Sequence, residues 1–128
     1  MKKLIIILLL PLTSFAQNFI ITDTIFLDKN WEITSDRTQA EYYRGTLYNS
    51  IDSTFLVHDF YLDNFSIQMI GVYKNSIKNS NQIGEFKYYY KSGNLRANYN
   101  YNNGKFHGQS IRYYKNGNIQ SIENYKSG

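Results

Sequence analysis

A twelve-residue pattern that occurs twice, 24 residues apart, is the feature that most constrains how this chain can fold. The first copy begins at Gly84 and the second at Gly108. Each runs from a glycine through a pair of tyrosines to a glycine, an asparagine and an aliphatic residue. A fixed period of this length indicates a repeat architecture, in which each unit buries one face only by packing on its neighbour. We therefore expect two stacked copies of one small unit.

Alternating side chains within each copy predict a β-hairpin. A two-residue turn at Ser92-Gly93 would place Tyr90 opposite Leu95. Alternation then puts six side chains of this hairpin on a single apolar face, with polar side chains on the other. The six are Phe86, Tyr88, Tyr90, Leu95, Ala97 and Tyr99.

The second copy has a stronger turn signal but a less regular face. Asn116-Gly117 suits a type I′ turn, because asparagine and glycine both accept the positive φ that its central residues need. In this register, however, Ile111 and Ile122 fall on the face opposite to the apolar one. Either a bulge switches the faces or something covers the second one.

Composition favours strands throughout the chain. Thirteen tyrosines and eight phenylalanines are more at home on a pleated surface than in a helix. The single proline, Pro11, lies near the start, so no proline interrupts the strands expected after it. The predicted fold class is all-β, an antiparallel meander of β-hairpin repeats with a period of about 24 residues. One short helical turn is expected near residues 35–40, with Ser35 as its N-cap.

The first residues have the layout of a secretory signal peptide. Lys2 and Lys3 supply a charged region, residues 4–10 an apolar region, and Ala16 ends a small-residue cleavage site. We expect cleavage after Ala16 and export to the periplasm or the extracellular space; an uncleaved N-terminal anchor is the alternative. The sequence has no cysteine, so we expect neither disulfides nor lipoprotein-type acylation.

The chain divides into three segments of different charge and character. Residues 1–16 form the signal peptide, residues 17–83 an N-terminal β region with a degenerate repeat, and residues 84–128 the two hairpin repeats. The middle segment has five basic and eight acidic side chains, whereas the last has seven basic and two acidic. So positive a segment can attract acidic partners or anionic lipid headgroups; a solvated repeat face is the alternative. The open strand edge of the last repeat leads us to expect edge-strand self-association.

No set of catalytic residues accompanies the repeats. His58 and Asp59 are adjacent in a predicted strand, so they point to opposite faces and cannot form a local dyad. His107 lies in a glycine-flanked link, and the carboxylates are scattered enough to be ordinary surface residues. We therefore expect no metal site, no cofactor and no enzymatic activity. The only tryptophan, Trp31, is expected to anchor a core rather than to form a ligand platform.

The tyrosines and cations of the repeats separate into two groups. The tyrosines expected in the core are Tyr88, Tyr90, Tyr99, Tyr101, Tyr114 and Tyr125. The residues expected on an exposed binding face are Lys87, Tyr89, Lys91, Arg96, Arg112, Tyr113 and Lys115. Tyrosines beside cations can stack on bases or sugars. Because export argues against nucleic acid, the expected partner is an envelope protein, a glycan or an anionic lipid surface.

The repeat resembles the MORN-repeat variant found in bacterial proteins that are often labelled antitoxin-like. The matching positions are Gly84, Phe86, Tyr89, Tyr90, Gly93, Leu95 and Tyr101 in one copy. In the next copy they are Gly108, Tyr113, Tyr114, Asn116, Gly117, Ile119 and Tyr125. Ser110 replaces the usual aromatic residue in the last copy, and Ser92 replaces the usual asparagine in the first.

Two segments of the N-terminal half, residues 26–31 and 40–44, also look like the corresponding part of exported Bacteroidetes-type proteins that carry such repeats. The resemblance implies arrays of β-hairpins that serve as interaction scaffolds, sometimes at membranes, without a cofactor. The predicted function is therefore an exported, non-catalytic β-repeat scaffold or binding module of the cell envelope. The alternative is an antitoxin-like or immunity protein that blocks a cognate toxin.

Overall fold

The structure is a computed structural model that describes residues 19–22 and 24–126. The predicted signal peptide lies outside the described residues. Within them, ten strands and one 3₁₀ turn account for the regular structure. The strands are β1 (Phe19–Ile21), β2 (Ile25–Asp28), β3 (Ala40–Asn49), β4 (Thr54–Tyr61), β5 (Ile67–Lys74), β6 (Gln82–Tyr89), β7 (Leu95–Asn102), β8 (Lys105–Phe106), β9 (Gly108–Tyr113) and β10 (Ile119–Tyr125).

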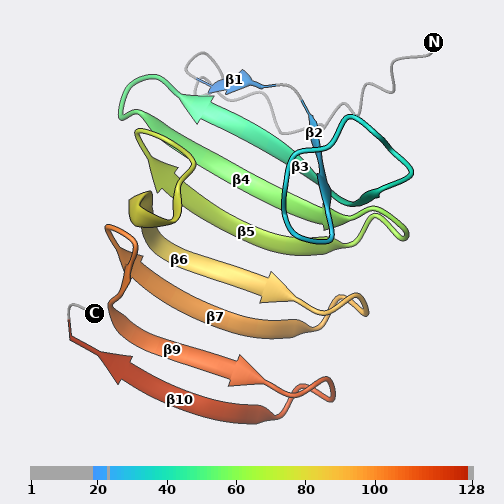
Figure 1. Ribbon diagram of the computed structural model, residues 1–128. Coiled ribbons are helices and arrows are strands. Elements are labelled where there is room, and N and C mark those ends of the chain that lie inside the picture. Colours follow the sequence, from blue (N-terminus) through green and yellow to red (C-terminus); the bar gives the residue numbers. More distant parts are fainter. Residues whose placement is uncertain (1–18, 23, 127–128) are drawn as a thin grey trace.

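These strands form one antiparallel sheet that runs almost in sequence order. The order is β1-β3-β4-β5-β6-β7-β9-β10, with β2 also pairing with β3 and β8 also pairing with β7. Figure 1 shows the strands following one another down a single curved layer, with β1 and β2 near one end and β10 at the other. The predicted all-β antiparallel meander is confirmed. In the described part of the chain, no helix is long and apolar enough to cross a membrane.

The core lies on one face of the sheet, which we call the core face. Its buried cluster consists of Val57, Met69, Tyr73 and Phe86, drawn from β4, β5 and β6. Ile77, from the segment between β5 and β6, packs against this cluster. Residues that alternate with the cluster along each strand point to the opposite face, which we call the outer face.

The first predicted hairpin has the expected register in its middle. Phe86 pairs with Tyr99 and Tyr88 with Ala97, and the Phe86 side chain is 0% exposed. Near the turn the register changes, because Tyr89 rather than Tyr90 pairs with Leu95. The prediction that Leu95 lies opposite Tyr90 was therefore wrong.

The cause of this shift is a loop one residue longer than predicted. The Tyr90 carbonyl accepts from Gly93 N, and Tyr90 N donates to the Asn94 carbonyl. The second hairpin repeats both bonds, at Tyr114, Gly117 and Asn118. Among the described loop residues, Gly93 and Gly117 have positive φ, 89° and 87°, and their predecessors do not. Both turns are thus three-residue loops that end in a left-handed glycine, and the two-residue turns, including the type I′ turn, were wrong.

The last hairpin settles which face its isoleucines occupy. Ile111 pairs with Asn98 of β7 and with Ile122 of β10, and all three lie on the outer face. A bulge does occur in β10, but it lies between Ile119 and Ser121. On the core face the same hairpin carries polar groups, so the apolar wall does not continue unbroken into the last repeat.

Three expectations for the N-terminal half were wrong. Residues 37–39 form a hydrogen-bonded turn rather than a helical one, and Asp36, not Ser35, accepts the Thr38 amide. The described 3₁₀ turn is at Asn79–Asn81. Trp31 is 40% exposed and so anchors no core. Asp59 is not a surface carboxylate, because it is 1% exposed and forms a two-pronged ion pair with Arg44.

Candidate functional site

The residues predicted to share one exposed face are divided between the two faces of the sheet. Arg112 pairs with Ala97, whose other neighbour is Tyr88, so Arg112 lies on the core face. Arg96 also lies there, because its guanidinium sits over the Tyr88 ring. The bulge next to Leu95 brings Arg96 to this face, which simple alternation would have placed on the other.

The other predicted residues lie elsewhere. Lys87, Tyr89 and Tyr113 alternate with core-face residues and therefore point to the outer face. There Lys87 forms an ion pair with Glu85 at 3.0 Å. Lys91 and Lys115 lie at corresponding positions in the two glycine loops.

On the core face, three cations each lie over a tyrosine ring. The Cζ atoms of Arg96 and Arg112 are 5.8 Å from the ring centroids of Tyr88 and Tyr99. The Nζ atom of Lys115 is 6.0 Å from the centroid of Tyr90. Such contacts are electrostatically favourable because the ring face is negative. We call this set the tyrosine–cation site: Tyr88, Tyr90, Tyr99, Arg96, Arg112 and Lys115.

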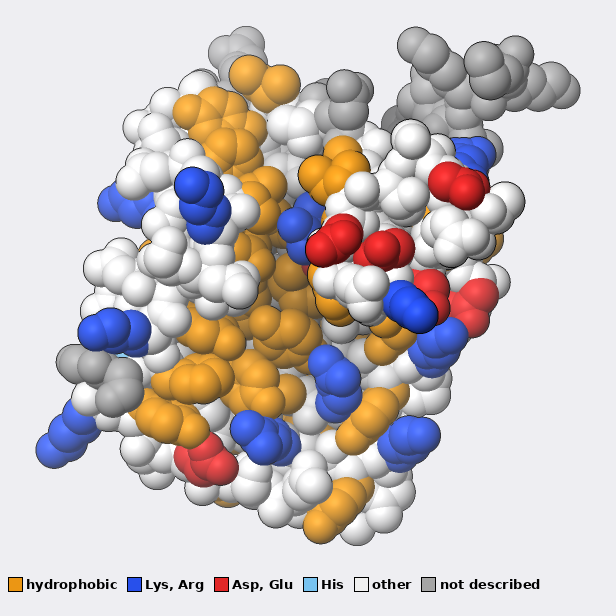
Figure 2. Space-filling view, in the orientation of Figure 1, with side chains coloured by type: hydrophobic (Ala, Val, Ile, Leu, Met, Phe, Trp, Pro, Cys, Tyr) orange, Lys and Arg blue, Asp and Glu red, His pale blue; other side chains and the backbone are white. Residues whose placement is uncertain are grey.

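Four residues of the site line a shallow cleft. The cleft has a volume of about 320 Å³ and is lined by Tyr90, Arg96, Ala97, Tyr99, Arg112 and Gln120. In Figure 2 blue Lys and Arg side chains lie beside the orange apolar surface over the C-terminal strands. Most of the red acidic side chains in that view gather near the opposite end of the sheet.

The cations of this site form no ion pair in the described part of the chain, although the charge of Glu123 acts on Arg112. The ion pairs there join Arg44 to Asp59, Lys87 to Glu85 and Lys91 to Asp63. Arg96, Arg112 and Lys115 take part in none of them. With three cations and one nearby acid, Glu123, the site carries a net positive charge beside aromatic rings, which an anion could balance.

Polar contacts fix how these side chains lie. Arg112 Nε donates to the Tyr99 hydroxyl at 3.0 Å, which raises the pKa of Arg112. Burial raises the pKa of Tyr88, so its hydroxyl stays neutral near pH 7. The nearby carboxylate of Glu123 accepts from the Tyr125 hydroxyl. The arrangement offers cationic donors and neutral hydroxyls.

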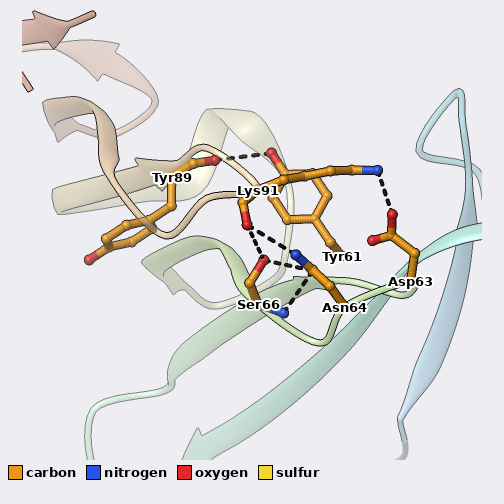
Figure 3. Close-up of polar contacts among 6 residues, drawn as sticks. All are labelled: Tyr61, Asp63, Asn64, Ser66, Tyr89 and Lys91. Atoms are coloured by element: carbon orange, nitrogen blue, oxygen red, sulfur yellow. Dashed lines mark hydrogen bonds and ion pairs between the residues drawn. The ribbon is translucent and has the colours of Figure 1, made fainter. Parts of the chain in front are cut away.

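A ladder of hydrogen bonds between successive turns holds the loops in place. The Tyr61 hydroxyl donates to the Tyr89 carbonyl at 3.0 Å, and the Tyr90 hydroxyl donates to the Tyr113 carbonyl at 2.8 Å. Figure 3 shows the first rung, where Asn64 and Ser66 also donate to the Lys91 carbonyl. These hydrogen bonds place the lysine of each turn over the tyrosine ring of the preceding turn, Lys91 over Tyr61 and Lys115 over Tyr90.

Asn94 repeats the role of Asn64 one turn later, since its Nδ2 atom donates to the Lys115 carbonyl at 2.9 Å. Lys91 itself belongs to a neighbouring part of the surface. Its Nζ atom pairs with Asp63 at 2.8 Å and lies 5.4 Å from the centroid of the Tyr61 ring. Its charge is therefore balanced, unlike that of Lys115.

Sequence reasoning assigned Tyr88, Tyr90 and Tyr99 to the core and so left them out of the site. They do lie on the core face, but the cleft exposes parts of Tyr90 and Tyr99 beside the arginines. The bulge at Arg96 follows from the extra residue of the glycine loop, which the sequence does not distinguish from a two-residue turn. Among the described residues, no group of three or more His, Asp or Glu side chains could hold a metal ion.

Comparison with known families identifies the repeats. Residues 82–103 and 106–127 each match the MORN repeat variant, and together these segments make up less than half of the chain. MORN repeats are generally non-catalytic binding or scaffold modules. All six residues of the tyrosine–cation site lie within the two matched segments. No curated protein and no solved structure matched the chain.

Proposed function

We propose that this chain is an exported, non-catalytic scaffold that binds an anionic group of a cell-envelope partner at the tyrosine–cation site. The group is a phosphate or a carboxylate, carried by a glycan or by a lipid headgroup. The observation that carries the proposal is that Arg96 and Arg112 line one cleft, that Lys115 lies over the adjacent Tyr90 ring, and that none of the three forms an ion pair within the described residues.

The chemistry of the cleft matches such a group. Arginine presents several N–H donors in a planar fork that suits carboxylate and phosphate oxygens. The two guanidiniums lie on adjacent strands, and the bond from Arg112 to Tyr99 restricts how one of them can move. A site that is already oriented loses less conformational freedom when it binds.

The charge of the repeats also supports binding of an anionic group. Residues 84–128 carry seven basic and two acidic side chains, so the whole segment attracts anions over a longer range. At the N-terminal end, residues 1–16 have the layout of a secretory signal. An exported protein with a cationic cleft would meet the anionic glycans and lipids of the envelope.

The test compares two variants of equal charge change. In Arg96→Gln/Arg112→Gln the cleft loses both guanidiniums; in Lys87→Gln/Lys105→Gln two cations outside it are lost. Each protein is titrated with polygalacturonate, a carboxylated glycan, and with vesicles that contain phosphatidylglycerol. Dextran and phosphatidylcholine vesicles are the neutral controls. Thermal unfolding verifies that both variants are folded.

The arginine variant is expected to bind anionic probes at least tenfold more weakly, because a hydrogen bond to a charged group contributes about 1.5 to 3 kcal/mol. The lysine variant should retain most of the affinity. Glycan binding without vesicle binding identifies the glycan as the source of the anion, and the reverse identifies the lipid. Equal losses in both variants would reduce the effect to general charge and overturn the proposal. Capture of one stoichiometric protein at high salt would favour the immunity-type alternative.

A further inference from the structure

Trp31 occupies an unusual position for the chain's only tryptophan. It lies in the loop between β2 and β3, is 40% exposed, and has a positive φ of 65°. Its ring stacks on Tyr42, with the ring centroids 4.1 Å apart and the planes 13° from parallel. A bulky residue in the left-handed region is costly unless the surroundings enforce it, and such outliers gather at ligand sites.

The surroundings do enforce this conformation. The Asp28 side chain accepts from the amides of Asn30 at 2.8 Å and Glu32 at 3.1 Å. The backbone adds two more bonds, from Trp31 N to the Asp28 carbonyl and from Asp28 N to the Glu32 carbonyl. Four hydrogen bonds thus fix a five-residue loop, and the indole is held on the surface.

Next to this stack lies a second cleft, of about 320 Å³. Tyr42 and Tyr61 supply its aromatic side, with ring centroids 5.8 Å apart. The cleft is lined by Ala40, Glu41, Tyr42, Tyr61, Leu62, Asp63 and Lys91. Leu62 N donates to the Glu41 carbonyl at 2.9 Å, which ties the start of β3 to the turn that follows β4.

The polar groups at this cleft are of both kinds. Glu41 and Asp63 offer carboxylate acceptors, and Lys91 offers ammonium donors. Lys91 lies across the Tyr61 ring and reaches Asp63, as Figure 3 shows. The lysine holds the pKa of the Asp63 carboxyl below its usual range, so the carboxylate stays ionised near pH 7.

We propose that this cleft binds a neutral sugar unit against the aromatic wall of Tyr42 and Tyr61, with Trp31 stacked on Tyr42 beside the cleft. A pyranose has an apolar C–H face for an aromatic wall and hydroxyls that both donate and accept hydrogen bonds. The two carboxylates would repel an anion, and the ammonium of Lys91 would repel a cationic ligand. The site is separate from the tyrosine–cation site and does not depend on its function.

The single tryptophan makes the test direct, because all indole fluorescence of the protein comes from Trp31. The full chain is titrated with the β-1,4-linked disaccharide of N-acetylglucosamine, with tetramethylammonium as the cationic probe and acetate as the anionic probe. We expect a change in Trp31 emission that saturates with the disaccharide and not with either ion. Calorimetry of the same titration measures the affinity independently of the fluorophore.

Two pairs of variants separate a binding role from a structural one. Glu41→Ala should weaken disaccharide binding at least fivefold, whereas Glu32→Ala, which removes an acid next to Trp31 but outside the cleft, should leave it unchanged. Trp31→Ala should weaken calorimetric binding at least fivefold, because it removes the ring that stacks on Tyr42, whereas Arg96→Gln/Arg112→Gln should not alter it. No saturable response of the wild-type chain to the disaccharide, or saturation by tetramethylammonium instead, would overturn the proposal. An equal loss in Glu32→Ala would also contradict it.

Discussion

Arg44 binds both carboxylate oxygens of Asp59 on the core face, with its Nε and Nη2 atoms each 2.7 Å from an oxygen. The two residues lie directly opposite each other on β3 and β4. Asp59 is 1% exposed, and the Arg44 side chain is 16% exposed. An ion pair so deeply buried is stable only while both partners are present, because either charge alone would be left without solvent.

Asp59→Asn should therefore destabilise the protein by about 3 to 5 kcal/mol, the usual cost of breaking a buried pair. Chemical denaturation measures the change. Arg44→Met/Asp59→Leu removes both charges and should be less destabilised than Asp59→Asn alone. If the double variant were the less stable of the two, the pair would be contributing net stability rather than only avoiding a lone buried charge.

Because Gly71 has no side chain, the Phe86 ring can occupy the space above it. A Cβ atom at position 71 would collide with three carbons of that ring, and the ring is fully buried. Gly71→Ala should cost about 1 to 3 kcal/mol, as overpacking in a filled core does. Gly45→Ala is the matched control, because a Cβ there would meet no atom within 4 Å. Similar unfolding free energies for the two variants would contradict this account of the core.

The central register of the repeat could be predicted from sequence because it depends on local alternation. Phe86, Tyr88, Ala97 and Tyr99 follow the period of two that a strand imposes, and the structure pairs them as expected. The glycines at the turns were also recognisable, since positive φ is strongly selective for glycine. The fold class followed from these two signals together.

The position of the candidate site depends on features that neither the alternation of side chains nor the turn glycines indicate. One extra loop residue shifts Leu95 against Tyr89 and turns Arg96 to the core face. Loops of two and three residues can both end in glycine, so the sequence alone did not distinguish them. Burial of Asp59 and exposure of Trp31 arise from contacts between β2, β3 and β4, which lie outside the repeat and have no period to reveal them.

The assigned loops make a prediction that separates the two kinds of turn. Gly117 has φ of 87°, and a Cβ there would meet nothing, so substitution costs only backbone strain. Gly117→Val should destabilise by about 1 to 3 kcal/mol. Asn116→Ala should cost much less, because residue 116 has no positive φ and loses only its bond to Asn118 N. A type I′ turn would require positive φ at both positions. Comparable decreases in melting temperature for the two variants would therefore support a type I′ turn and contradict the three-residue loop.

The rungs between turns can be measured one hydroxyl at a time. Tyr61→Phe and Tyr90→Phe each remove a donor to the carbonyl of the next turn and should each cost about 0.5 to 1.5 kcal/mol. Tyr114→Phe is the matched control from the last described turn. Within residues 24–126 the Tyr114 hydroxyl makes no such bond, and the residue is 51% exposed. A loss as large for Tyr114→Phe would show that the hydroxyls act through something other than the ladder.

His58 should make the stability of the fold depend on pH. It lies on the outer face between Gly45 and Ile70, and burial lowers its pKa although the neighbouring Asp59 charge acts in the other direction. The unfolded chain therefore takes up a proton at this side chain at a higher pH than the folded chain does. The contribution of His58 to stability is complete above the usual histidine pKa of about 6.5 and decreases as pH falls from there to the folded-state pKa. The melting temperature of each protein is measured one pH unit above and one pH unit below that value. The decrease between the two should be smaller for His58→Gln than for the wild type. Equal decreases in both proteins would mean that another group is responsible for the pH dependence.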